Sequence, residues 1–283
     1  MVRIELAGSL IRPKPLVFRY TANDTFYPGN YTSLDYTHYD VICIGGGGGP
    51  GGGITGTTGT LISIHGGAGG GGGYHRVHGL LSALGSACAV VVGQGGAVGT
   101  QHASNPAATT DGGDGGASTF AGTVCQASGG KGGKRVQSIS GAAIADGGEG
   151  GVGNRNIAGG GAVGGVNPGP GVTGTPGGDG TFFGDVGKGG GGGAGGSADY
   201  NGTLHFLGTA GGRGSYNPSN LSVYAPGDLP DADSQAGNQK IWPGGAGGAK
   251  TSPLTGLPTL YGGSQGIFAA GFAGVVIIRL TGE

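Results

Sequence analysis

The apolar residues of this chain gather in short runs that glycine blocks separate. The runs YDVICI at 39–44, VVV at 90–92 and FAGVVIIRL at 272–280 are rich in β-branched side chains. Continuous apolar runs of strand length are typical of strands that are buried on both faces. The first run comes directly before the first long glycine block and the last run directly after the glycine-rich segments. We therefore expect these two strands to pair and to bring the ends of the glycine-rich body together.

The first 38 residues have a different pattern. Glycine is sparse there, aromatic side chains are frequent, and Pro13 and Pro15 separate the segments VRIELAG and PLVFRYT. This arrangement is typical of two strands around a turn that proline restricts. We predict an N-terminal β attachment element at residues 1–38 and a glycine-rich domain with variable loops at residues 39–283.

Residues 74–92 allow two interpretations. Four apolar side chains have the spacing of one helical face: Val77, Leu80, Leu81 and Leu84. A short helix is therefore one possibility. The β-branched residues 90–92 and the glycine at position 79 favour strands instead. We expect a hairpin that turns near Leu84 and Gly85.

Composition excludes several architectures. Of 283 residues, 78 are glycine. A glycine inside a helix costs about 1 kcal/mol relative to alanine, so a helical bundle is ruled out. A glycine inside a strand adds no side chain to the packing, so we expect no ordinary Leu/Ile/Val core. Collagen needs glycine at every third position, and runs such as 45–49 break that phase. Disordered linkers place Ser, Glu and Lys between their glycines rather than β-branched clusters, so we expect an ordered chain.

The glycine blocks suggest one particular ordered structure. Units such as GGAGG, GGKGG and GGEGG recur at irregular spacing. A threefold extended polyglycine-II helix rises about 3.1 Å per residue and has no internal hydrogen bonds, so many copies packed side by side can satisfy one another. Such packing needs glycine on every contacting face. The predicted fold is therefore mostly β and irregular: an N-terminal β element and a body of packed polyglycine-II helices bracketed by strands, with almost no α-helix.

Charge and hydropathy exclude some partners. The chain has 14 Lys and Arg against 15 Asp and Glu, which argues against nucleic-acid binding. No run approaches 18 apolar residues and no export signal is visible, so we expect no membrane insertion and synthesis in the host cytoplasm. Cys43, Cys88 and Cys125 are interpreted as small buried hydrophobic residues.

Motifs for catalysis or metal binding are weak. The sequence GGSQG at 262–266 matches a nucleophile elbow, but glycine is so frequent that such a match is expected by chance. We therefore predict no enzymatic activity and no cofactor. His75 and His78 are weak metal candidates, because a spacing of three on an extended chain places them on opposite faces.

Several carboxylates flank glycine pairs. They are Asp111, Asp114, Asp146, Glu149 and Asp179. Tandem calcium-binding repeats would be needed for a calcium site, and these are absent from the sequence. We interpret the carboxylates as caps of loops.

The long segments between glycine blocks in the second half are rich in aromatic side chains. Tyr and Trp give large contact area at low entropic cost, and polar neighbours add adaptable hydrogen bonds, as in binding loops. The alternative is that these side chains only cap the glycine lattice or pack the loops on each other. The candidate receptor-binding residues are Tyr200, His205, Phe206, Tyr216, Tyr224, Trp242 and Tyr261.

The order of these parts resembles a known family. A strand running into glycine (VICIGGGGG), a glycine–aromatic junction (GGGGGYHRV), a strand exit (VVVGQGGAVG), the GGxGG blocks and the closing GVVIIRL strand are similar to the glycine-rich domain of tailed-phage minor tail proteins and tail-fibre tips. More distant relatives are T-even-type distal fibre adhesins, in which packed polyglycine-II helices present receptor-binding loops. The resemblance covers about residues 39–283.

That resemblance implies a function and partners. The chain would be a structural protein of the phage tail tip or tail fibre that recognises the host cell surface through loops on a glycine-rich scaffold. It would bind other tail proteins through residues 1–38, contact a host envelope glycan or surface protein, and form a homotrimer. The alternative is a purely architectural minor tail or baseplate protein without receptor contact.

Overall fold

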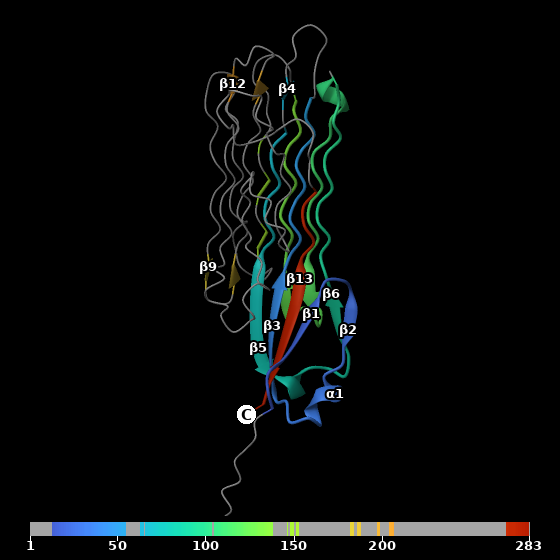
Figure 1. Ribbon diagram of the computed structural model, residues 1–283, viewed down its shortest axis with the longest axis vertical. Coiled ribbons are helices and arrows are strands. Elements are labelled where there is room, and N and C mark those ends of the chain that lie inside the picture. Colours follow the sequence, from blue (N-terminus) through green and yellow to red (C-terminus); the bar gives the residue numbers. More distant parts are fainter. Residues whose placement is uncertain are drawn as a thin grey trace, which may run out of the picture.

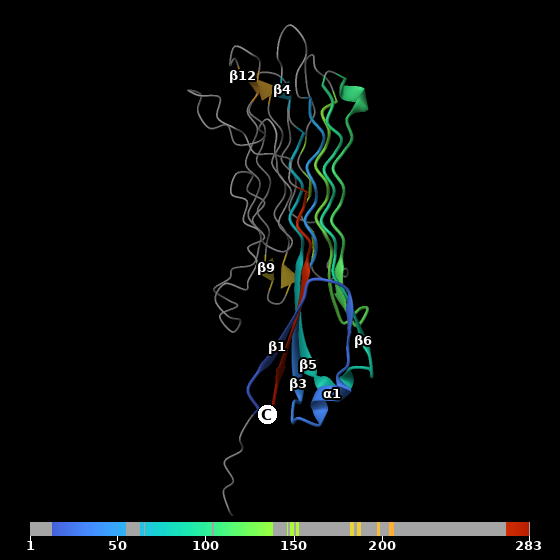
Figure 2. The same ribbon diagram turned by 45° about the vertical axis from the view of Figure 1, so that its right-hand side comes forward.

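The computed structural model describes residues 13–54, 63–64, 66–103, 105–137, 146, 148–149, 151–152, 182–183, 186–187, 197–198, 204–206 and 270–282. The described chain is mostly strand and irregular, as predicted; its helices are α1 (Gly29–Thr32) and two single 3-10 turns, η1 (Leu81–Ala83) and η2 (Pro106–Ala108). Strands form a base at one end, and glycine segments extend from it side by side (Figures 1 and 2). None of the helices in this part of the chain is long and apolar enough to cross a bilayer.

The larger sheet of the base contains the first and the last of the apolar runs, which bracket the glycine-rich body. Its six strands lie in the order β1 (Leu16–Tyr20), β13 (Val275–Thr281), β3 (His38–Ile44), β5 (Tyr74–Leu80), β10 (Val186–Gly187) and β9 (Phe182–Phe183), each antiparallel to its neighbours. Strands β3 and β13 pair over their full length, with Ile44 opposite Val275 and His38 opposite Thr281. The expected pairing of the two bracketing strands is confirmed.

The other strands of the described chain form two smaller sheets. A four-stranded sheet has the order β2 (Asp24–Phe26), β6 (Cys88–Val91), β7 (Ser118–Phe120) and β8 (Cys125–Ala127). Ala121 and Gly122 have positive φ values of 47° and 66° in the tight β7–β8 turn, where Gly122 carries no steric penalty. A three-stranded sheet has the order β12 (Leu204–Phe206), β11 (Ser197–Ala198) and β4 (Ser63–Ile64).

The predicted hairpin within residues 74–92 is wrong. Both strands exist, but β5 pairs with β3 and β6 pairs with β2 and β7, so they belong to different sheets. The helical alternative is limited to the single turn η1, which begins at the buried Leu81. Strand β6 buries every second residue, as a strand does when it covers a core from one side. The segment after η1 therefore crosses from one sheet to the other.

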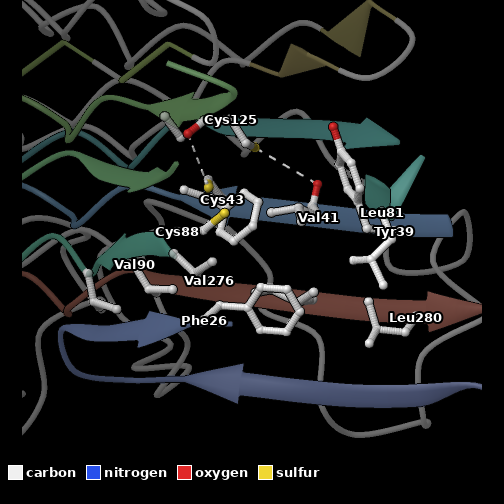
Figure 3. Close-up of a cluster of buried hydrophobic side chains, with 14 residues drawn as sticks. Phe26, Tyr39, Val41, Cys43, Leu81, Cys88, Val90, Cys125, Val276 and Leu280 are labelled. Carbon is white, nitrogen blue, oxygen red and sulfur yellow. Dashed lines mark hydrogen bonds between the residues drawn. The ribbon is translucent and has the colours of Figure 1, made fainter. Parts of the chain in front are cut away.

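A side-chain core rich in Val, Ile, Leu and Phe fills the space between the six-stranded and four-stranded sheets (Figure 3). The expectation of no ordinary core is therefore wrong for the base, because the few apolar runs all meet there. Strand β3 turns Tyr39, Val41 and Cys43 toward this core, and turns Ile42 and Ile44 to the opposite face. Both faces of β3 are therefore buried, as the continuous apolar run predicted. All three cysteines are buried with free thiols, which confirms their interpretation as small core residues.

Above the base, glycine segments form a hydrogen-bonded bundle, here called the lattice. Its described members lie in residues 45–53, 66–73, 93–100, 110–117, 128–137, 146–152 (of which 147 and 150 are outside the described residues) and 270–274. Donors of the central segment, residues 45–53, change direction with a period of three. Gly45, Gly48 and Gly51 donate to the carbonyls of Gly73, Gly70 and Gly67, at 3.0, 2.8 and 2.9 Å. Gly46, Gly49 and Gly52 donate to Gly116, Gly113 and Thr110, at 2.9, 2.9 and 2.8 Å.

The same central segment contacts three further segments. Gly47 donates to Phe272, while carbonyls of the central segment accept hydrogen bonds from residues 96–102 on one side and 130–136 on another. Threefold periodicity and outward-pointing backbone groups are the features of the polyglycine-II helix. The lattice that the glycine blocks predicted is therefore present, and the central segment bonds to five described neighbours.

Glycine is needed in the lattice for close approach. A methyl group built on Gly48 would lie less than 3.0 Å from the carbonyl of Lys131, and one on Gly49 less than 3.0 Å from that of Ala97. Among the described glycines, only Gly122 has a φ in the left-handed region. The lattice glycines therefore have a backbone that other residues can adopt, and it is neighbouring backbone that excludes a side chain.

Four strand pairs of the base continue into the lattice without a change of register. Ile44 lies opposite Tyr74 in the β3–β5 pair, and the next residue, Gly45, bonds to Gly73. The β3–β13, β6–β7 and β7–β8 pairs continue in step in the same way: Gly47 bonds to Phe272, Gly113 to Ala97, and Gly115 to Gly130. The base therefore aligns the glycine segments.

The boundary predicted between residues 38 and 39 stays a prediction. Strands β1 and β2 precede it, and they pair with β13 and β6 of the glycine-rich part.

Candidate functional site

The lattice has two different ends. The first and last described residues, Pro13 and Gly282, lie against each other at the base. The opposite end, here called the far end, carries the loop 101–109 with η2, and strands β4 and β12 lie at that end as well (Figure 1). Surface loops held by a rigid scaffold are the usual location of binding residues. The far end is therefore the candidate functional site.

Side chains close the lattice beneath the far-end loop. Gly53 N–H donates to Gln101 Oε1 at 2.9 Å, and Thr100 N–H donates to Thr110 Oγ1 at 2.8 Å. Thr109 Oγ1 donates to the Val136 carbonyl at 3.1 Å. These side chains supply partners to backbone groups at the point where the glycine pattern stops, as buried backbone groups require.

Three hydrogen bonds hold the loop itself. His102 N–H donates to the Gly53 carbonyl at 3.1 Å, and its Nδ1 accepts the N–H of Asn105 at 2.8 Å. Asn105 Oδ1 then accepts the N–H of Ala107 at 3.0 Å. Exposed residues such as Ala103, Asn105 and Ala107 therefore stand on a fixed backbone. The sequence interpretation missed this loop, although an Asn-Pro pair such as Asn105-Pro106 is a turn signal.

The candidate receptor-binding residues are only partly within the described chain. His205 and Phe206 lie on β12, at the far end. The other five lie outside the described residues: Tyr200, Tyr216, Tyr224, Trp242 and Tyr261. The assignment of all seven stays a prediction.

The two candidate metal-binding histidines lie on one strand but point to opposite faces. Both belong to β5; His75 is buried and His78 is exposed. His75 Nδ1 accepts the backbone N–H of Gln126 at 3.0 Å, which fixes the ring within the core. Within the described ranges, no three His, Cys, Asp or Glu side chains are placed to hold a metal ion together.

The buried thiols bond to the backbone between the two sheets. Cys125 Sγ donates to the His75 carbonyl at 3.3 Å, and Cys43 Sγ donates to the Cys125 carbonyl at 3.6 Å. Burial raises the pKa of the Cys43 thiol well above its ordinary value, and the neighbouring Cys125 adds to the effect. A buried protonated thiol is a poor nucleophile, so Cys43 has a packing role.

Charged side chains line one outer surface of the lattice. We call this set the carboxylate–lysine ladder: Asp111, Asp114, Lys131, Lys134, Asp146 and Glu149. Asp114 accepts hydrogen bonds from Lys131 Nζ at 2.7 Å and Gly132 N–H at 2.9 Å. Asp111 accepts from Lys134 Nζ and Arg135 N–H, both at 2.9 Å. The interpretation of Asp111 and Asp114 as loop caps is therefore wrong: they lie on a glycine segment and bind the outward donors of the next one.

These contacts shift the ionisation of the ladder. Partial burial on its own raises the pKa of Asp111, but the hydrogen bonds from Arg135 N–H and Lys134 outweigh it, so the pKa is lowered. For Asp114 the same burial effect is outweighed by Lys131 and Gly132 N–H, and its pKa is lowered too. The hydrogen bond to Asp111 raises the pKa of Lys134, with smaller contributions from Asp114 and Asp146. The charged forms of Asp111, Asp114 and Lys134 are therefore favoured in the folded protein.

Comparison with known protein families shows a match over most of the chain. A family model described as a glycine-rich domain matches residues 22–281. No curated protein matches the sequence. The match includes β2 through β13, and so both the base and the lattice.

Proposed function

This chain belongs to the glycine-rich domain family, and from that premise we propose that it is a structural protein of a phage tail tip or tail fibre that recognises the host cell surface. The base would attach to other tail proteins, and the far end would contact an envelope glycan or surface protein. The proposal assigns binding and no catalytic step.

The observation that carries the proposal is the separation of the two ends. Both described termini lie at the base, so a chain attached there would hold the far-end loop and β12 away from its anchor. Backbone hydrogen bonds between neighbouring segments make the intervening lattice rigid. Loops on a pre-ordered support lose less conformational entropy when they bind. The order of the sequence parts, which resembles that of phage tail proteins, adds to this support.

Assembly into a trimer is part of the proposal. Weak contacts at three far ends would add by avidity if all three can reach one surface. Attachment through the N-terminal element, residues 1–38, would place the three bases together. Sedimentation of the purified chain, expected at the mass of three copies, tests this part separately.

Labelling of assembled particles tests the location. A short peptide tag inserted after Asn105, at the far end, or after Gly122, in the β7–β8 turn of the base, is detected by gold-labelled antibody on virions. We expect both labels at the tail, with the Asn105 label farther from the capsid. Particles that contain the protein but carry the label elsewhere would refute the proposal.

Competition for adsorption distinguishes receptor binding from pure architecture. Purified protein added before the phage should occupy the receptor and slow adsorption to host cells. A protein in which the segment 213–243 is replaced by a Gly-Ser linker is the matched comparison, and it should compete less well. If neither protein slows adsorption although both are present on virions, the architectural alternative is correct.

A further inference from the structure

The carboxylate–lysine ladder crosses three neighbouring glycine segments. Residues 110–117 carry its two aspartates, residues 128–137 its two lysines, and residues 146–152 its remaining two acids. Within each segment the two charges are three residues apart, and in a threefold helix such residues point in the same direction. The ladder therefore has two levels: Asp114, Lys131 and Glu149 in one, and Asp111, Lys134 and Asp146 in the other.

Backbone hydrogen bonds alone leave the alignment of glycine segments ambiguous. Each turn of a threefold helix presents the same donors and acceptors, so a slip of three residues keeps the backbone pairing between two glycine runs. For residues 110–117 and 128–137 the β7–β8 pair removes the ambiguity, because both segments continue its register. No strand of the described base pairs with residues 146–152. Ser128, directly after β8, donates its N–H to the Val152 carbonyl and accepts the Val152 N–H through Oγ, both at 2.8 Å. Every turn of a threefold helix presents the same backbone groups, so these two bonds leave a slip of one turn open and the alignment needs a further determinant.

We infer that the carboxylate–lysine ladder sets the register of residues 146–152 against residues 128–137. In the observed register Lys131 N–H donates to the Glu149 carbonyl at 2.7 Å, and Lys134 N–H donates to the Asp146 carbonyl at 2.8 Å. Each lysine therefore lies between an acid of one neighbouring segment and an acid of the other. The pKa of Lys134 is raised by acids of both neighbours, which agrees with this position.

A slip by one turn in either direction would lose one level of the ladder. In one direction Glu149 moves beside Lys134, and Val152 replaces it beside Lys131. In the other direction Asp146 moves beside Lys131, and Ala143 takes its place beside Lys134. The observed register is the one in which both lysines have two acidic neighbours.

Moving the acids by one turn tests the register directly. In the variant Asp146→Cys/Val152→Glu/Gln137→Cys the acids of the third segment stand at positions 149 and 152. The ladder then favours a slip of one turn, which brings positions 137 and 146 together. We expect a 137–146 disulfide to form under mild oxidation about tenfold faster than in Asp146→Cys/Gln137→Cys alone. Equal rates in the two proteins would overturn the inference.

Charge inversion supplies a second readout. The variant Asp111→Lys/Asp114→Lys/Lys131→Asp/Lys134→Asp keeps attraction between the first two segments and makes the third segment face like charges. Gly148 and Gly151 donate to Ala68 and Gly71 at 2.8 and 2.7 Å, so their amide exchange reports on docking of the third segment. We expect exchange about tenfold faster at both glycines. Adding Asp146→Lys/Glu149→Lys to this variant should restore slow exchange at both glycines.

The controls separate the ladder from general surface charge. Gln94→Lys/Thr100→Lys adds two charges at exposed positions of residues 93–100, outside the ladder, and should leave exchange at Gly148 and Gly151 unchanged. Slow exchange at Ile278 in the base shows that each variant is folded. Unchanged exchange in the four-residue variant, or failure of the six-residue inversion to restore it, would contradict the ladder as the register determinant.

Discussion

The base and the lattice bury their backbone in different ways. In the base, two sheets lie apart and side chains such as Phe120 and Ile278 fill the space between them. In the lattice, the continuations of these sheets bond directly, as Gly46 does to Gly116. One region is therefore stabilised by packed apolar side chains, and the other by backbone hydrogen bonds over distances that leave no room for a side chain.

The junction between the two regions explains how one chain supports both. Strands in register enter the lattice in register, so the side-chain core selects an alignment that glycine alone does not encode. Where the core ends, Ser118 Oγ accepts the N–H of Gly93 at 3.0 Å, and a side chain takes the place of a backbone carbonyl. The comparison predicts that adding a methyl group destabilises the lattice, whereas removing a methyl group destabilises the base.

The largest expected effect is the addition of one methyl group inside the lattice. Gly49→Ala would force the new carbon against the carbonyl of Ala97, and rigid backbone surrounds it. We expect a loss of about 3 kcal/mol or more in the free energy of unfolding, since overpacking here cannot be relieved by a rotamer change. Urea denaturation measures it, or the soluble fraction if the variant aggregates.

Gly29→Ala is the matched control, because a methyl group there meets nothing within 4 Å. It should be neutral or slightly stabilising, by up to about 1 kcal/mol. Equal stability of the two alanine variants would mean that the lattice is not closely packed at Gly49.

The next effect is expected at the junction. Ser118 is fully buried, and its replacement by alanine leaves the N–H of Gly93 without that acceptor. An unsatisfied buried donor costs about 2 kcal/mol. Thr119→Ala, on the other face of β7, is the control and should cost less. A Ser118→Ala protein as stable as wild type, by chemical denaturation, would show that the hydroxyl is not needed there.

Removing one methyl group from the base should lower the free energy of unfolding less than adding one methyl group to the lattice does. Ile278 is fully buried in the core, and Ile278→Val leaves a small cavity that neighbouring side chains partly fill. The expected loss is about 1 kcal/mol. A cost greater than that of Gly49→Ala in the same denaturation assay would reverse the comparison.

The smallest effect concerns pH. The folded state lowers the pKa of Asp111 and Asp114 below the ordinary 3.8, so their contribution to stability is complete above that pH and is lost as pH falls through the folded-state values. Lys134 has a raised pKa, so its contribution is complete below 10.5 and is lost at higher pH. Because the pairs are about half exposed, each is worth less than about 1 kcal/mol.

Asp111→Asn/Asp114→Asn tests this dependence. Between pH 7 and pH 3, wild type should lose more stability than the double variant, as measured by urea midpoints at the two pH values. A larger loss in the double variant would have the wrong sign for these pKa shifts.

The sequence predicted the parts of the fold that depend on local pattern. The apolar runs identified β3 and β13, and the glycine blocks identified the lattice, because only a backbone-packed structure uses so many glycines. The partners of β5 and β6 could not be predicted. Strand β5 begins 30 residues after the end of its partner β3, at Tyr74 after Ile44, and the predicted hairpin satisfied the same local pattern.

The candidate site was harder to predict. The far-end loop depends on Gln101, Thr109 and Thr110 meeting segments distant in sequence, which a local pattern does not reveal. The ladder did leave a signal, since its acids and lysines recur at a spacing of three within glycine blocks. Their pairing depends on which segments are neighbours in the lattice.

Amide hydrogen exchange along residues 93–100 tests the central claim most directly. Gly96 and Gly99 donate to the carbonyls of Gly47 and Pro50, and each of the five residues 45–49 donates to a carbonyl of a neighbouring segment. A threefold lattice therefore predicts slow exchange at 96 and 99 and uninterrupted protection from 45 to 49. Protection that alternates with a period of two, or its absence throughout the glycine segments, would contradict the lattice.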